Sequence, residues 1–435
     1  MIVSLPTASS TENVHALEEV QDFATTDMGN PEGGSYTYRI LREPILSHEL
    51  ARMAHATVIR STLTHHVTFQ PCSPLEHENE DRLLAQEWDI PGLGSWIFNA
   101  VFDGHVNSFT VDYVTQNLPR ILRRNLANAL AALNDRTEPD ADTSYADTVP
   151  RILQEAVVYL DEQIWYDLVD ALPSDWETAS PEALTHHFNA DTQAYERAAR
   201  CLGGCTAVFA LTDPARHMAW VVSLGAVVRR SGSAMVGTHV NKLHNARSGE
   251  EVAYIQSLHP SEPNIVADER VLGYLEPTRG FGDTWLKRPR LAALLMTVNQ
   301  DWLSSSSLVE YGSQMLHPPY ILNTPDVHTV HLSEADVDEY FLILASDGLA
   351  DCDTYEPLEP PDLAVAWAEV LRAELEQERS AGARPNLALS LVRAALGGSD
   401  ERQVSRNMTV EMDDRWMDDT TVIVQRIPNR SRPHK

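Results

Sequence analysis

The architecture of this chain is indicated by two apolar runs that each lead into Asp-Gly. They are Ile97-Phe98-Asn99-Ala100-Val101-Phe102 before Asp103-Gly104, and Phe341-Leu342-Ile343-Leu344-Ala345 before Ser346-Asp347-Gly348. Each run has the length of a strand and ends in turn residues, which is typical of a buried β-strand. Residues 221–224 and 420–424 have the same β-branched character. The sequence therefore predicts strands in both halves of the chain.

Helical patterns lie between these strands. Apolar residues recur every three to four positions in the stretches 109–133 (kinked or divided at Pro119), 151–172, 182–201, 363–378 and 387–396. Strands near both ends with helices between favour one α+β domain, completed by distant segments of the chain. We expect this domain over residues 36–428, a mobile acidic tail or a docked arm over 1–35, and a basic tail over 429–435.

The charge of the chain limits its partners. The formal charge is −30, from 63 acidic and 33 basic residues, so nucleic acid is expected to be repelled. A phosphate anion would also be repelled unless an arginine or a metal ion supplies local positive charge. Apolar runs are far shorter than the roughly 20 residues that cross a bilayer, so no membrane segment is expected.

The expected compartment follows from cysteine usage and from the first residues. The four cysteines are scattered and form no CxxC pair, which favours a reducing compartment. No Lys or Arg precedes Arg39, which is the reverse of an import signal. Cytosol or nucleus is expected, with the mitochondrial matrix as a less favoured alternative.

Three aspartates adjoin the predicted strands. Asp103 and Asp347 follow a strand, and Asp418 precedes one. Opposite ends of neighbouring antiparallel strands lie side by side, so the three carboxylates would share one rim. Carboxylates that close together need cations to stay ionised, and oxygen-only ligands favour Mg²⁺ or Mn²⁺. Taken singly, each Asp-Gly is more often a simple turn, so an acidic surface remains the alternative.

Several short motifs, read in chain order, resemble those of the PPM-type, or protein phosphatase 2C-like, family. They are Asn79-Glu80-Asp81-Arg82, Val101-Phe102-Asp103-Gly104-His105, Gly203-Gly204-Cys205-Thr206-Ala207, Thr278-Arg279-Gly280-Phe281-Gly282-Asp283, Leu344-Ala345-Ser346-Asp347-Gly348-Leu349 and Asp418-Asp419-Thr420-Thr421-Val422. The resemblance implies an αββα sandwich, in which helices flank two central antiparallel β-sheets. It also implies a metal-dependent phosphatase acting on phosphoserine or phosphothreonine in phosphoprotein substrates.

Some details are similar to the pyruvate dehydrogenase phosphatase branch of that family. They are Glu80-Asp81-Arg82, Leu243-His244-Asn245, Arg270-Val271-Leu272-Gly273, Gly282-Asp283 with Lys287 after it, and Pro318-Pro319-Tyr320. An enzyme of that branch would act in mitochondria, for which the N-terminal residues give no signal. The branch resemblance therefore implies shared sequence without fixing a shared substrate.

The resemblance also implies a set of metal ligands. Asp103 would bridge two Mg²⁺ or Mn²⁺ ions, and the Gly104 carbonyl would complete the second site. Asp347 and Asp418 would hold the first ion. The residues expected to orient waters on these ions are Glu80 and Asp81.

His105 is the expected catalytic partner of Asp103. It follows Asp103 by two residues and would protonate the departing Ser or Thr alkoxide. A histidine pKa of about 6.5 suits this general-acid role near neutrality. The adjacent histidines 65–66 and 186–187 cannot face one metal from a helix, so both pairs are predicted to be surface residues. Cys201 and Cys205 are predicted to be core residues rather than ligands.

Several positions depart from the family pattern. Ala226 stands where many members carry the aspartate of a third metal site, and Val106 and Ala350 replace the usual small residue and Trp. Glu76 lies near the place of an expected phosphate-binding arginine. These changes leave open an alternative, a pseudophosphatase that keeps the fold to bind a partner. A non-protein phosphomonoesterase is a third, less favoured class, and the oligomeric state cannot be predicted.

Overall fold

The computed structural model describes residues 22–32, 34–72, 78–134, 145–262, 264–288, 291, 294–295, 315–352, 358–381 and 384–431. Its contacts divide the chain into two compact units. The first comprises residues 1–79, 228–238 and 345–426, and the second comprises 80–227, 239–344 and 427–435. Each unit is made of segments far apart in the sequence, as expected for sheets completed by distant strands.

The second unit is built on an antiparallel sheet. Its strands have the order β14 (Val327–His331), β8 (Met218–Val222), β7 (Gly204–Thr212), β6 (Gly94–His105) and β5 (Arg82–Ile90), and the short β13 (Phe281–Gly282) pairs with β7. The long strand β6 is buried along most of its length, which suits a central strand between β5 and β7. The predicted strand 97–102 lies within β6.

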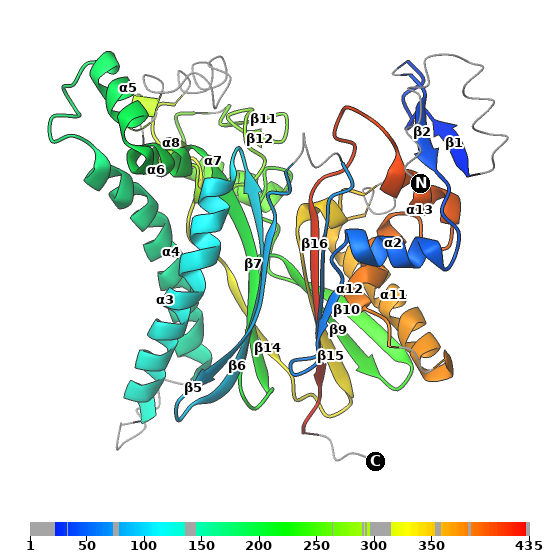
Figure 1. Cartoon of the computed structure of the whole chain (residues 1–435). Coiled ribbons are helices and arrows are strands. Elements are labelled where there is room, and N and C mark those ends of the chain that lie inside the picture. Colours follow the sequence, from blue (N-terminus) through cyan, green and yellow to red (C-terminus); the bar gives the residue numbers. More distant parts are fainter. Residues whose placement is uncertain are drawn as a thin grey trace. The chain divides into compact units, whose positions relative to one another are not determined.

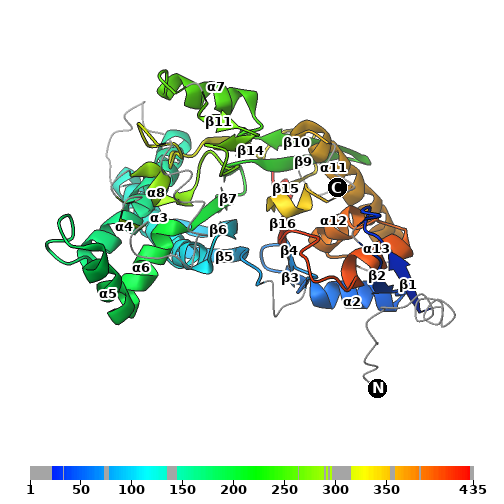
Figure 2. The same cartoon turned by 90° about the horizontal axis from the view of Figure 1, so that it is seen from above.

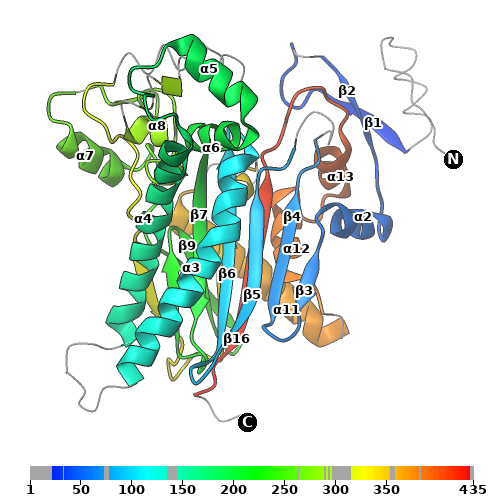
Figure 3. The same ribbon diagram turned by 60° about the vertical axis from the view of Figure 1, so that its left-hand side comes forward.

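Two long helices cover one face of this sheet. α3 (Ser108–Asn134) and α4 (Tyr145–Ala171) contact each other, and α3 also packs against β5, β6 and β7 (Figures 1 and 3). α3 runs through Pro119 as one helix. Further helices in the described part of the unit include α5 (Pro181–Ala190), α6 (Thr192–Leu202), α7 (Gly249–Leu258) and α8 (Thr284–Lys287). A small hairpin joins β11 (Val266–Ala267) to β12 (Arg270–Val271).

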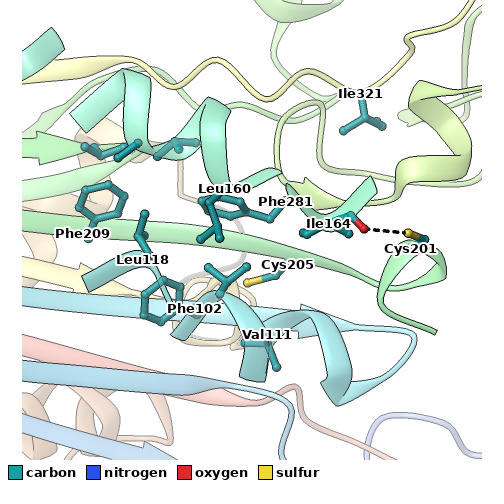
Figure 4. Close-up of a cluster of buried hydrophobic side chains, with 14 of the residues drawn as sticks. Phe102, Val111, Leu118, Leu160, Ile164, Cys201, Cys205, Phe209, Phe281 and Ile321 are labelled. Carbon is teal, nitrogen blue, oxygen red and sulfur yellow. Dashed lines mark hydrogen bonds between the residues drawn. The ribbon is translucent and has the colours of Figure 1, made fainter. Parts of the chain in front are cut away.

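The core of the second unit lies between the sheet and these helices. Phe102 and Phe209 of the sheet lie near Leu118 and Leu160 of the helices (Figure 4). Burial of one such side chain stabilises the fold by about 1.5–3 kcal/mol. Cys201 and Cys205 are fully buried here, as predicted, and the Cys201 thiol donates to the Ile164 carbonyl.

The other sheet has six strands. Their order is β10 (Ala234–Val240), β9 (Gly225–Ser231), β15 (Glu339–Ala345), β16 (Thr420–Pro428), β4 (Thr64–Phe69) and β3 (Thr57–Ile59). β4 pairs antiparallel with both β16 and β3. The predicted strands 341–345 and 420–424 lie within β15 and β16. The chain thus has the α+β fold with antiparallel sheets and flanking helices that the sequence predicts.

Where the first unit is described, its helices are α2 (Ile45–Met53), α11 (Pro360–Ala381), α12 (Leu387–Ala395) and α13 (Glu401–Thr409). α12 packs on β4 and on α11, which Figure 2 shows from above. β1 (Phe23–Thr26) and β2 (Tyr36–Arg39) form an antiparallel pair that contacts α13 through β2. Within the stretch 1–35, the described residues therefore include a paired strand; the first 21 residues lie outside the described part, as does the loop 138–144.

The single helix predicted over 182–201 is wrong, because Asp191 divides it. The backbone of Asp191 is extended, with φ −121° and ψ 103°, which ends α5. Its carboxylate then accepts the N–H groups of Gln193 and Ala194 and so caps α6.

The surface position predicted for His65 is also wrong. His65 is only 8 % exposed, because α12 packs on β4. Its Nδ1 accepts the N–H of Leu387 at the start of α12. Burial and the nearby Arg426 lower the pKa of His65 to about 4. His66 and His187 are half-buried, and His186 is exposed.

No helix among the described residues is long and apolar enough to cross a membrane.

Candidate active site

Asp103, Gly104 and His105 lie at the carboxyl end of β6. The register pairs Asp103 with Thr206, Gly104 with Cys205 and His105 with Gly204 of β7. These ladder bonds fix the backbone of the Asp-Gly-His motif on one side. The motif is therefore an extension of a central strand rather than a simple turn.

Glu80 and Asp81 reach the same end of the sheet from the other side. β5 pairs with β6 from Arg82 opposite Phe102, so the residues before Arg82 run beside Asp103 and Gly104. A Cβ on Gly104 would lie 2.9 Å from the main-chain oxygen of Glu80 and 2.9 Å from Val111. The absence of a side chain at position 104 is thus what permits this close approach. Asp81 is buried, with 5 % of its surface exposed.

His105 forms a hydrogen bond with a residue for which the sequence predicted no site role. Its Nε2 lies 2.9 Å from Oδ2 of Asp283, which follows β13. The side chain of His105 is 24 % exposed, whereas that of Asp283 is 2 % exposed. The imidazole therefore reaches the surface while its partner is buried. The sequence did contain a sign of Asp283, because the Gly282-Asp283 motif resembles the family pattern, but no function was assigned to it.

Asp347 and Asp418 come together in the first unit. Asp347 begins the short 3-10 turn η1 (Asp347–Leu349) after β15, and Asp418 lies two residues before β16. Ser346 joins the two segments, since its N–H donates to the Thr421 carbonyl and its hydroxyl accepts the Thr421 N–H. These bonds join the segment that carries Asp347 to the segment that carries Asp418; the shared site of Asp103, Asp347 and Asp418 stays a prediction.

Arg415 is a second residue that the sequence did not point to. Its guanidinium forms ion pairs with Asp418 and, at 3.1 Å, with Asp419. The side chain of Asp418 is 52 % exposed. It borders a cavity of about 470 Å³ that is also lined by Met28, Tyr36, Gly348, Arg406 and Trp416. Asp418 is thus an accessible carboxylate beside an open space.

The donor types of both sets fit a hard divalent cation. Glu80, Asp81, Asp103 and the Gly104 carbonyl belong to the second unit, and Asp347 and Asp418 belong to the first. Carboxylate and carbonyl oxygens are the ligands that Mg²⁺ and Mn²⁺ prefer. Among the residues that the structure describes, no three His, Cys, Asp or Glu side chains form a metal-binding group.

Positions 226 and 106, two of those that depart from the family pattern, lie among the described residues. Ala226 is buried in β9, 2 % exposed. Val106, directly after the catalytic histidine candidate, has a φ of 73°, in the left-handed region that β-branched residues rarely adopt. Glu76 lies outside the described residues.

Comparisons with known proteins agree with the motifs. The sequence model of the family "Protein phosphatase 2C" matches residues 66–364, a range that includes Asp103 and Asp347 but not Asp418. A protein phosphatase 2C homolog of Schizosaccharomyces pombe is 23% identical over 360 residues, which cover 76% of this chain and 73% of the homolog.

Two further similarities cover different shares of the chain. The human mitochondrial pyruvate dehydrogenase phosphatase 2 is 29% identical over 180 residues, covering 36% of this chain and 33% of that protein. A solved serine-threonine phosphatase 2C from Toxoplasma gondii has 17% identity and a TM-score of 0.45, with 84% of this chain and 95% of that one covered. On the match of the family model to most of its length, the chain belongs to the protein phosphatase 2C family.

Proposed function

We propose that this chain is an active protein serine/threonine phosphatase that uses two Mg²⁺ or Mn²⁺ ions. The family is one of metal-dependent serine/threonine phosphatases. The observation that supports activity in this member is the arrangement at the end of β6, where Glu80 and Asp81 run beside Asp103, Gly104 and His105. A scaffold protein would have no need for a carboxylate pair, a close glycine and an imidazole that reaches the surface in one place.

We propose the following ligand roles. Asp103, the Gly104 carbonyl, Asp347 and Asp418 would supply the oxygen ligands that hold the ions. Glu80 and Asp81 would orient waters at the site by accepting their hydrogen bonds. The bound ions supply a water of lowered pKa and offset negative charge on the phosphoryl oxygens.

The chain's own residues then handle the leaving group. His105 donates a proton to the Ser or Thr oxygen as its bond to phosphorus breaks. No residue of the protein needs to become covalently phosphorylated.

Hydrolysis of a phosphothreonine peptide in the presence of Mn²⁺ tests the function. We expect activity in the native chain, its loss with EDTA, and its recovery when Mn²⁺ is added. Asp103→Ala and Asp418→Ala are expected to lower kcat/KM by at least about a hundredfold. Asp175→Ala is the matched control, because Asp175 is an exposed aspartate of the second unit outside the site and has no positive φ.

Two outcomes would favour other functions. Equal, near-zero rates for the native chain and both variants would show a pseudophosphatase. Faster hydrolysis of small phosphate esters than of phosphopeptides would show a metabolite phosphatase. The partial likeness to a pyruvate dehydrogenase phosphatase supports including a phosphopeptide from pyruvate dehydrogenase among the assayed substrates.

A further inference from the structure

Asp283 and His105 meet across a strand that carries no side chain between them. β6 and β13 both pair with β7 at Gly204, which lies opposite His105 on one side and Gly282 on the other. A Cβ on Gly204 would lie 2.1 Å from His105 Nε2 and 2.1 Å from Asp283 Oδ2. The hydrogen bond between the two residues therefore occupies the space that a side chain at position 204 would take.

The backbone holds Asp283 in an uncommon conformation. Its φ of 43° and ψ of 36° lie in the left-handed region. Its N–H donates to the Gly203 carbonyl at 2.9 Å, which fixes the residue against the start of β7. Left-handed conformations cost energy for residues other than glycine, although Asp and Asn tolerate them best. Such strain is often found where a side chain has a functional position.

A buried ion pair between Asp161 and Lys287 stabilises the turn that carries Asp283. Asp161 of α4 accepts the N–H of Gly282 at 2.9 Å and binds Lys287 Nζ at 2.8 and 2.9 Å. Lys287 in turn donates to the Gly280 carbonyl. The turn that carries Asp283 is therefore held on both sides, and its carboxylate has little freedom to leave His105.

We propose that Asp283 is a positioning residue for His105: its carboxylate accepts the Nε2–H, so that the ring presents Nδ1 as the atom that donates the proton. This rests on the proposed function, in which His105 protonates the leaving oxygen. A buried carboxylate fixes the tautomer and orientation of an imidazole in the same way in other hydrolases. In this step the imidazolium ring gives its Nδ1 proton to the departing alkoxide, so the alkoxide becomes a neutral alcohol and the ring becomes neutral.

A positioning role for Asp283 would show in how the hydrolysis rate depends on the leaving group of the substrate. A serine alkoxide is a strong base and needs a proton as it departs, whereas p-nitrophenolate departs without one. Loss of a general acid should therefore slow alkyl phosphates far more than aryl phosphates. A residue with a merely structural role would slow both substrates alike.

Asp283→Asn is the informative variant. Asparagine has the same size and also tolerates the left-handed conformation, so the fold is expected to persist. We expect kcat on a phosphoserine peptide to fall by about tenfold more than kcat on p-nitrophenyl phosphate. In a His105→Gln background, the same substitution should have little further effect on the peptide, because residues that act as a unit are not additive.

Two other substitutions serve as controls. Asp268→Asn changes an exposed aspartate that also has a positive φ, 51°, and is expected to alter neither rate. Asp161→Asn weakens the support of the turn that carries Asp283. It is expected to lower the melting temperature and to slow the peptide more than the aryl ester, but by less than Asp283→Asn does. Melting temperatures of all variants show whether each one is folded.

A spectroscopic readout is independent of turnover. In ¹⁵N-histidine NMR spectra of the neutral ring, His105 is expected to carry its proton on Nε2 in the native chain and to populate both tautomers in Asp283→Asn. Equal losses on the two substrates, or an unchanged tautomer, would overturn the proposal while leaving an active phosphatase. If the native chain hydrolyses neither substrate, the proposed function fails and this proposal fails with it.

Discussion

Gly348 lies so close to Asp419 that a Cβ on the glycine would be 2.1 Å from the main-chain oxygen of the aspartate. The turn that begins with Asp347 is thereby packed against the segment that carries Asp418. Gly348→Ala should separate the two segments, because a methyl group cannot occupy that space. We expect the free energy of unfolding to fall by about 3 kcal/mol, as in severe overpacking, and phosphatase activity to fall with it. Urea titration and the phosphopeptide assay measure these effects.

Gly249→Ala is the matched control for this substitution. A Cβ on Gly249, the first residue of α7, would meet nothing within 4 Å. Alanine there should leave stability unchanged or raise it slightly. Equal stability of the two alanine variants would show that the contact between positions 348 and 419 is not as close as described.

Val106 carries backbone strain beside the catalytic motif. Its φ of 73° places a β-branched residue in the left-handed region, at a cost of about 1–2 kcal/mol. Its side chain is 37 % exposed, so little apolar contact is lost on truncation. Val106→Gly is therefore expected to raise the free energy of unfolding by about 1 kcal/mol, net of the greater entropy of glycine in the unfolded chain.

The control for this effect is Val236→Gly in β10. Val236 is also exposed and has no positive φ, so glycine there should destabilise the protein by about 0.5–1 kcal/mol. Denaturant titrations of both variants give the comparison. A loss of stability in Val106→Gly as large as that in Val236→Gly would contradict strain at position 106.

His65 should make stability depend on pH in the mildly acidic range. Its pKa is lowered to about 4 in the folded state, mainly by burial, from 6.5 in the unfolded chain. Above pH 6.5 both states have the neutral ring, and the full stability is present. As the pH falls from 6.5 to 4 the unfolded chain takes up a proton that the folded chain refuses, so stability is lost. The total loss is on the order of 3 kcal/mol.

His65→Gln isolates this contribution, because the glutamine oxygen can still accept the N–H of Leu387 and has no charge to gain. Urea titrations of both proteins at pH 7.5, 5.5 and 4.5 measure it. We expect the stability of the native chain to fall more steeply below pH 6.5 than that of the variant. Parallel pH dependences would show that His65 is protonated equally in both states.

The strongest strands and the aspartates beside them could be predicted from the sequence. The run before Asp103 and the run before Asp347 are long, apolar and end in turn residues, and they lie in β6 and β15. β15 and β16 are neighbours in their sheet, so the segments of Asp347 and Asp418 meet at adjacent strand ends; the shared rim with Asp103 stays a prediction. Local pattern was sufficient in these cases because each strand is buried on both faces.

Features that depend on distant contacts could not be predicted in this way. β5 has the mixed sequence Arg-Leu-Leu-Ala-Gln-Glu-Trp-Asp-Ile and is recognisable only through its pairing with β6. The bond between His105 and Asp283 joins residues 178 positions apart. Asp191 did carry a local signal, since aspartate is a favoured N-cap, but the apolar spacing on both sides concealed it.

The buried ion pair of Asp161 and Lys287 gives the last prediction. Their side chains are 4 % and 9 % exposed, so removal of one charge leaves the other without compensation in the interior. Lys287→Met and Asp161→Asn are each expected to destabilise the protein by about 3–5 kcal/mol. The double variant should lose less than the sum of the two, with a coupling energy of about 1–3 kcal/mol.

An exposed pair on the same helix provides the comparison. Arg151 and Glu155 of α4 lie 3.3 Å apart with both side chains 62 % exposed, and such pairs couple by about 0.3–0.5 kcal/mol. A double-mutant cycle with alanine at these two positions should give that small value and lose it in 1 M salt, because salt screens exposed charges. The coupling between Asp161 and Lys287 should persist in the same salt. If it is no larger than that of the exposed pair, the turn that carries Asp283 is not held by this ion pair.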